Sequence, residues 1–195
     1  VGFDRSLIGA YGHDDRVCAY PILTAIADVA GKNEHTSVTI FADKEETGSD
    51  GNTGMQSFAF ENMLYELAEN AGANPRIMFA NSKCLSADVN ACYDPNFGEV
   101  YESRNSAFIN KGLVVTKFTG GGGKSSTNDA HAEYVAYIRK ILNDAGVLWQ
   151  TAELGKVDEG GGGTVAAYIA NLNVDTIDLG VPVLSMHAPY EIVSK

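Results

Sequence analysis

Two adjacent glutamates, Glu45 and Glu46, are the residues of this sequence best suited to do chemistry. They follow an apolar run at 37–42 that predicts a buried strand, and a glycine-containing loop comes after them. Side chains of neighbouring residues on an extended chain point to different sides. One carboxylate can therefore bind a metal ion while the other faces a reacting water, which favours a hydrolase. A solvated charge pair at a strand end is the simpler alternative for this segment alone.

Three other segments place acidic residues or histidine at the ends of apolar runs: 12–16 (GHDDR), 86–90 (SADVN) and 184–189 (LSMHAP). In open α/β sheets, ligands bind outside the carboxyl ends of the strands. Carboxylates and an imidazole gathered at such an edge favour a divalent metal ion. Taken alone, His187 is more typical of an ordinary hydrogen-bonded histidine than of a ligand.

Strands that alternate with helices predict the fold class that would bring these segments together. The pattern predicts an α/β protein, a layered sheet with helices on both faces. The predicted helices are 16–30, 54–71, 77–80, 128–145 and 164–171, the predicted strands are 37–42, 83–87, 113–118, 147–151 and two short pieces within 176–185, and residues 1–13 are predicted to be loop.

Length and charge narrow the class of protein further. The 195 residues suffice for one domain with a sizeable core. A formal net charge of -11 argues against nucleic-acid or anionic-membrane binding. No apolar run is long enough to span a membrane, and no signal peptide is visible. The cysteines, Cys18, Cys84 and Cys92, are odd in number and lack CxxC spacing, which indicates free thiols in a reducing cytoplasm.

Two glycine clusters interrupt the pattern, at 120–123 and 160–163. The first precedes Lys124 and Ser125, but a phosphate-binding loop that ends there requires glycine at position 118, where the chain has Phe118. The phosphate-binding motif is therefore not matched, which argues against nucleotide binding. The second cluster opens a predicted helix, where the backbone can approach a ligand; a flexible loop is the equal alternative.

Six stretches of the sequence together resemble the aminopeptidase I / aspartyl aminopeptidase family of dinuclear zinc exopeptidases. They are YGHDDRVCAY, FADKEETGSDG, LSADVNA, GGKSSTNDAHAE, ELGKVDEGGGGT and DLGVPVLSMHAPYE, and they cover almost the whole chain. The resemblance implies a zinc-exopeptidase-like catalytic domain with a general base at Glu45. It implies metal ligands at Asp14, which bridges the ions, and at Glu46, Asp88 and His187. It also implies that Lys124, Gly161 and Gly162 border the substrate pocket.

The activity implied by this resemblance is hydrolysis of the N-terminal residue from peptides with a free N-terminus. Two divalent metal ions, zinc or alternatively cobalt or manganese, would bridge a water that Glu45 activates. The resemblance also implies a homo-oligomer, such as a tetrahedral dodecamer, and a cis peptide bond between Asp14 and Asp15.

The sequence departs from the family pattern at its beginning. Residues 1–13 contain nothing like the family's His-x-Asp ligand motif, and the dimerisation domain that precedes the Asp-Asp segment is absent. Residues 1–195 are therefore expected to be the C-terminal part of the catalytic domain, inactive alone and binding at most one metal ion tightly. A non-catalytic oligomer-forming or cargo relative remains an alternative, as does a deacetylase or carboxypeptidase of the same fold class.

Overall fold

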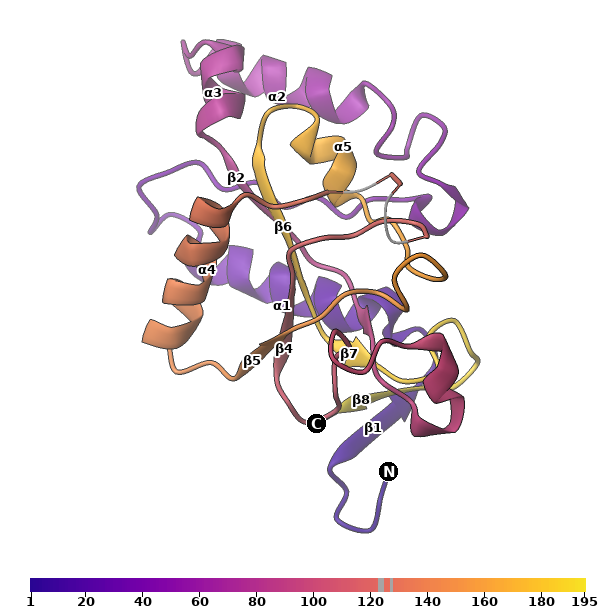
Figure 1. The fold of residues 1–195 in the computed structure, drawn as a ribbon. Helices are drawn as coiled ribbons and strands as arrows, with labels where there is room; N and C mark the ends of the chain where they lie inside the picture. The colour runs from indigo at the N-terminus through magenta and orange to yellow at the C-terminus, as the bar shows by residue number, and fades with distance from the viewer. Residues whose placement is uncertain (123–124, 127) are drawn as a thin grey trace.

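A mixed four-stranded sheet forms the centre of the computed structural model, which describes residues 1–122, 125–126 and 128–195 (Figure 1). The outer pairs are parallel, and the two inner strands run antiparallel to each other. In spatial order the strands are β2 (Lys83–Ser86), β6 (Asp175–Gly180), β4 (Leu113–Thr116) and β5 (Trp149–Thr151). The predicted strands at 83–87, 113–118, 147–151 and 176–185 are thus present, most of them shorter.

Two small ladders lie beyond the central sheet. The short strands β3 (Asn90–Ala91) and β7 (Pro182–Val183) pair in parallel. The strands β1 (Leu7–Ala10) and β8 (Glu191–Ser194) pair antiparallel. The prediction that residues 1–13 are loop is therefore wrong. Nothing near β1 in the sequence indicates a strand, because its hydrogen-bonding partner comes from the other end of the chain.

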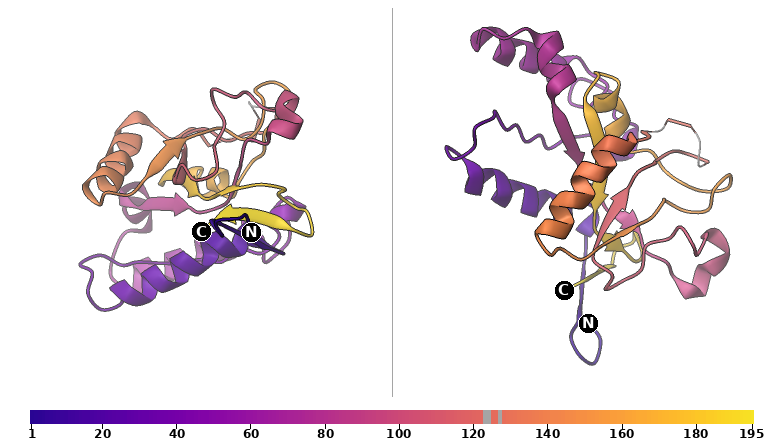
Figure 2. Two further views of the ribbon diagram at one scale, coloured as in Figure 1. Left: turned by 90° about the horizontal axis from the view of Figure 1, so that it is seen from below. Right: turned by 60° about the vertical axis from the view of Figure 1, so that its left-hand side comes forward.

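Helices lie on both sides of the strands, as predicted (Figure 2, left view, α1 and α4). Residues 54–58 and 128–131 lie outside the helices that were predicted to include them, and the helix predicted at 77–80 begins earlier, at Pro75. The helices are α1 (His13–Val29), α2 (Ala59–Asn70), α3 (Pro75–Asn81), α4 (Ala132–Asp144) and α5 (Ala166–Ala170), with 3₁₀ turns η1 (Glu45–Thr47) and η2 (Pro95–Val100).

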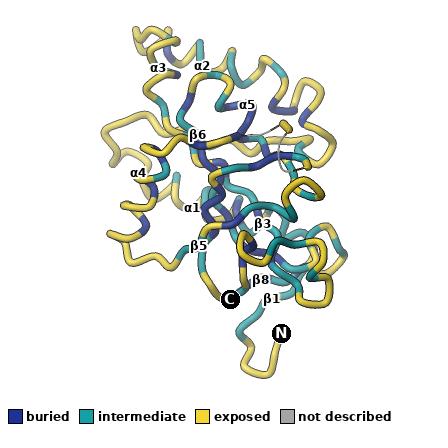
Figure 3. Tube along the Cα trace, in the orientation of Figure 1, coloured by how far each residue is buried: buried dark blue, intermediate teal, exposed yellow. Residues whose placement is uncertain are grey.

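The main core forms where α4 packs on the central sheet. Tyr134, Ile138 and Leu142 recur every fourth residue, so they share one face of α4. They pack against Val115 of β4 and Ile177 of β6, and all five residues are at most 7% exposed. Figure 3 shows the buried segments concentrated on the central strands, with exposed helices and loops around them. This core fixes the position of β6, and β6 in turn positions the neighbouring strand β2, which leads to Asp88.

The strand predicted at 37–42 is not formed. No backbone hydrogen bond joins this segment to the rest of the described chain. Val38, Ile40 and Phe41 are 45%, 37% and 55% exposed. An apolar run indicates that a segment favours burial, but a strand also needs a partner for its N–H and C=O groups, and no described segment provides one.

The three cysteines are free thiols, as predicted. Cys18 and Cys92 are buried, and burial raises the pKa of the Cys92 thiol to about 11, which leaves it unreactive near neutral pH. Among the described residues, no helix is both long and apolar enough to cross a membrane.

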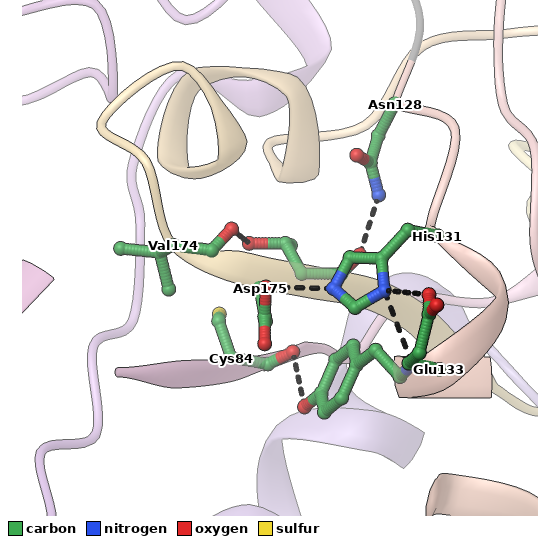
Figure 4. A network of polar contacts seen from close by, with 8 residues as sticks. Cys84, Asn128, His131, Glu133, Val174 and Asp175 are labelled. Atoms are coloured by element: carbon green, nitrogen blue, oxygen red, sulfur yellow. Dashed lines mark hydrogen bonds and ion pairs between the residues drawn. The ribbon is translucent and has the colours of Figure 1, made fainter. Parts of the chain in front are cut away.

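His131 joins the beginning of α4 to the beginning of β6 (Figure 4). Its Nε2 lies 2.7 Å from Asp175 Oδ1, and its Nδ1 lies 3.1 Å from Glu133 Oε2 and 3.3 Å from the Tyr134 backbone nitrogen. The neutral ring can accept the Tyr134 N–H at Nδ1 and cap the helix. The protonated ring instead donates from both nitrogens to the two carboxylates. Hydrogen bonds to Asp175, then to Glu133, therefore raise the pKa of His131.

We expect this arrangement to stabilise the protein below pH 6.5, the ordinary histidine value, and the stabilisation to be lost as pH rises through the raised pKa. An NMR titration of labelled histidines in the protein carrying this chain should give His131 a pKa above 6.5. Asp175→Asn should move that pKa back toward the ordinary value, whereas Asp28→Asn, at an exposed position of α1, should not. A His131 that titrates at or below 6.5 in the unchanged protein contradicts the prediction.

Candidate metal centre

The four acidic and histidine-containing segments meet at one place in the fold. Asp88 follows β2, and His187 follows β7. Asp14 lies at the start of α1, directly after β1, and Glu45 and Glu46 begin η1. All these side chains line one pocket of about 410 Å³. The convergence predicted from the sequence is therefore confirmed, although the run before Glu45 is not a strand.

The tightest group consists of Asp14, Glu46 and His187. The His187 Nε2 atom lies 2.9 Å from Asp14 Oδ2 and 3.1 Å from Glu46 Oε1. The Asp14 side chain is only 8% exposed, whereas those of His187 and Glu46 are 61% and 58% exposed. Asp14 is thus the buried end of the group, and the other two reach it from the solvent side.

A second group shares Asp14 and adds Asp15 and Asp88. One ligand atom from each of these carboxylates lies within 4.8 Å of the others. Asp15 was not assigned a role from the sequence, although its position beside Asp14 is a signal for one. The expected cis peptide bond between Asp14 and Asp15 is present. Asp14 is the only residue common to both groups found in the described part of the chain.

Like charges dominate the electrostatics of this pocket. Burial, then the neighbouring Glu46 carboxylate, raises the pKa of Asp14 to about 6. Burial and then Asp14 raise the pKa of Asp88 to about 6, and burial and then Asp88 raise the pKa of Asp15 to about 7. Carboxyl groups that repel one another in this way are stabilised in their ionised forms by a bound cation.

Glu45 lies in the pocket without belonging to either group. Successive residues of a 3₁₀ helix project about a third of a turn apart, so Glu45 and Glu46 point in different directions. Burial raises the pKa of Glu45 to about 7, with Asp88 and Glu46 adding to the rise. The different roles expected for the two glutamates therefore agree with the local geometry, although a 3₁₀ turn rather than an extended chain separates them.

The donor atoms present suit a divalent zinc ion. Carboxylate oxygens and an imidazole nitrogen are ordinary zinc ligands. One carboxylate oxygen of the second group, Asp15 Oδ1, is buried and has no hydrogen-bond partner among the described residues. A buried acceptor of this kind normally has a partner, and a cation beside Asp14 and Asp88 would serve as one.

Three residues of the glycine cluster at 160–163 line the pocket, and their expected contact with a substrate stays a prediction. Gly161, Gly162 and Gly163 all line this pocket, and the Gly162 carbonyl accepts a hydrogen bond of 2.9 Å from the Gly120 N–H. The two glycine clusters thus contact each other beside the pocket. Lys124, the other predicted substrate-binding residue, lies outside the described residues.

Glu191 orients the centre, and sequence reasoning missed it. The side chain comes from β8 and the residue is only 2% exposed. Its Oε2 accepts the Asp14 N–H at 3.0 Å, and its Oε1 accepts the His187 N–H at 2.8 Å. Burial alone would raise the pKa of Glu191, but these backbone hydrogen bonds outweigh it and lower the pKa. One buried carboxylate thereby fixes the backbones that carry two of the candidate ligands.

We expect Glu191→Gln to lower the free energy of unfolding by about 1–3 kcal/mol. The amide nitrogen cannot accept a hydrogen bond, so one of the two backbone N–H groups is left unsatisfied. Urea unfolding of the metal-free protein carrying this chain measures the loss. Glu69→Gln, at an exposed position of α2, is the matched control. Equal stabilities of the two variants would show that the hydrogen bonds of Glu191 do not stabilise the protein.

Comparison with known proteins decides the family. A family model described as aminopeptidase I zinc metalloprotease (M18) matches residues 1–195. The chain belongs to the M18 family. A probable M18 family aminopeptidase 1 from Clostridium acetobutylicum is 50% identical over 198 residues, which cover 100% of this chain and 42% of that protein. The counterpart from Thermotoga maritima is 46% identical over 200 residues, covering 100% and 44%.

Two solved structures have the same fold as this chain. The crystal structure of the M18 aminopeptidase from Thermotoga maritima matches with a TM-score of 0.89 at 46% identity, covering 100% of this chain and 44% of that one. The mApe1 dodecamer of Saccharomyces cerevisiae matches with a TM-score of 0.78 at 24% identity, covering 100% and 43%, which shows the fold alone. This M18 chain spans less than half the length of these relatives. The expected place of the chain within a full-length relative stays a prediction.

Proposed function

We propose that the protein carrying this chain removes single residues from the N-termini of peptides by zinc-dependent hydrolysis. The observation that supports this most strongly is the meeting of Asp14, Glu46 and His187 within hydrogen-bonding distance, in a pocket that also contains Asp88 and Glu45. The relatives at 50% and 46% identity are named aminopeptidases.

In this proposal, the two overlapping groups of ligands would hold two zinc ions. Asp14, Glu46 and His187 would hold one ion, and Asp14 and Asp88 would contribute to the other, with Asp15 beside them. When bound, zinc polarises the scissile carbonyl and makes the attacking water more acidic. Glu191 keeps Asp14 and His187 in place through their backbone N–H groups.

Glu45 acts as the general base. Its carboxylate takes a proton from the attacking water and later donates one to the leaving amine, which balances the protons over one turnover. A base that is not a metal ligand is free to move that proton. The pocket volume of about 410 Å³ accommodates the side chain of a terminal residue, with the backbone at 161–163 along one side.

The decisive experiment uses two short peptides of the same sequence, one with a free N-terminus and one N-acetylated. An aminopeptidase releases the first residue of the free peptide only. Removing metal with a chelator should abolish this activity, and zinc should restore it, with cobalt and manganese tested alongside.

Each rival function gives a different result in this experiment. A carboxypeptidase shortens both peptides from the other end, and a deacetylase releases acetate from the blocked peptide. A non-catalytic relative leaves both peptides intact with zinc bound. Any of these outcomes overturns the proposal.

We further propose that the protein acts as a homo-oligomer in the cytoplasm. A dodecamer is recorded for the yeast relative mApe1. The free thiols of this chain fit a reducing compartment. Light scattering of the purified protein gives the oligomeric state directly, and a monomer that is fully active would overturn the oligomer as the working form.

A further inference from the structure

A row of buried polar side chains crosses the central sheet behind the metal centre. Asp178 of β6 lies in register with Ser86 of β2 on one side and with Thr116 of β4 on the other. Asn90 of β3 extends the row, because its Nδ2 donates to Thr116 Oγ1 at 2.8 Å. All four residues are at most 5% exposed. Such a row in the middle of a sheet is costly to bury unless its polar atoms have partners.

Three of these residues have a side-chain oxygen that lacks a hydrogen-bond partner among the described residues: Ser86 Oγ, Asn90 Oδ1 and Asp178 Oδ2. Asp178 Oδ1 accepts a hydrogen bond from the Thr164 hydroxyl at 2.7 Å, but its Oδ2 has no partner among the described residues. Asn90 Oδ1 likewise has none. Asp178 and Asn90 line the same small cavity, together with Thr116 and Thr119. The volume open to the centre of a water-sized sphere is about 10 Å³. This cavity is therefore just large enough for one water molecule or one ion of similar size.

The charge of Asp178 indicates whether the cavity holds a water molecule or a cation. Asp178 carries the single carboxylate of the buried row, and no lysine, arginine or histidine of the described chain forms an ion pair with it. A buried carboxylate stays ionised only with a compensating charge. The remaining donors are amide and hydroxyl oxygens, which suit hard cations. Asp88 also lines the cavity, but it is a candidate zinc ligand whose charge zinc would balance, so a monovalent ion matches the charge that remains on Asp178.

We propose that this cavity is a binding site for one monovalent cation, Na⁺ or K⁺, held by Asp178 Oδ2, Asn90 Oδ1 and the hydroxyls of Thr116 and Thr119. The site does not depend on the peptidase reaction, because none of these residues is a candidate zinc ligand. It adjoins the metal centre, since Asp88, Leu154 and Thr164 line both the small cavity and the large pocket. A cation here would therefore favour the ionised form of Asp88 as well.

The test is thermal unfolding of the zinc-loaded protein in NaCl, KCl or choline chloride at equal ionic strength. Choline is too large for the cavity. One alkali ion, at about ten times its Kd, should raise Tm by roughly 3–5 °C over choline. Comparing the NaCl and KCl samples identifies which ion the site prefers.

Asp178→Asn should abolish this difference between salts, because the amide keeps the shape of the side chain and removes its charge. Asp28→Asn, at an exposed position, should retain the difference. If Asp178→Asn does not fold, crystals of the unchanged protein soaked in thallium(I) acetate test the same point. An anomalous peak between Asp178 and Asn90 supports the proposal. Equal Tm in all three salts, or a cavity without such a peak, overturns it and leaves a water or a protonated Asp178 in its place.

Discussion

Replacing Glu45 with glutamine in the protein carrying this chain should lower the rate of N-terminal residue release roughly 10²–10⁴-fold, with zinc content near normal. Glutamine keeps the shape of the side chain but cannot accept the proton of the attacking water. Zinc content should hold because Glu45 lies outside both ligand groups. The measurements are release from a short unblocked peptide and metal analysis of the same samples.

The neighbouring variant, Glu46→Gln, is the matched control, since it changes an adjacent residue in the same way. Glu46 Oε1 lies 3.1 Å from His187 Nε2, within one of the ligand groups. Its loss should lower zinc affinity first, and added zinc should restore part of the activity. If the Glu45 variant loses zinc while the Glu46 variant keeps it, the two roles are reversed. Full activity of Glu45→Gln would show that it is not the general base.

Asp14→Asn should remove both zinc ions, whereas His187→Ala should remove only one. Asp14 belongs to both ligand groups, but His187 belongs to one. The amide of asparagine is a neutral and weaker ligand, and the change also removes the buried negative charge at the centre of the site. Activity should therefore fall at least as far as in the Glu45 variant, by roughly 10²-fold or more.

Metal analysis after dialysis, by mass spectrometry, gives the zinc content per chain for both variants. His35→Ala is the control for His187, because His35 is an exposed histidine in the segment before η1. It should retain full zinc content and full activity. If Asp14→Asn keeps one zinc ion, then the two ions do not share this carboxylate, and the proposed bridging role is wrong.

The candidate site residues could be identified from the sequence by itself, because their types and local order do not depend on knowing the fold. Asp14, Glu46, Asp88 and His187 each follow an apolar run, and the pattern of alternating elements predicts that such ends gather at one edge of a sheet. The buried face of α4 is equally local: residues 134, 138 and 142 repeat at helical spacing and pack on the sheet. Periodicity determines which face of a helix is buried, whatever that face contacts.

Tertiary structure decided everything that depends on a partner distant in the sequence. The strand β1 exists because β8 pairs with it, and the apolar run at 37–42 remains unpaired because the described chain provides no neighbouring strand. Glu191 orients Asp14 across 177 residues of sequence. Asp178 is buried between Ser86 and Thr116 through strand register alone. Hydrogen bonds and burial between remote segments leave no local pattern, because each partner by itself resembles an ordinary polar or apolar residue.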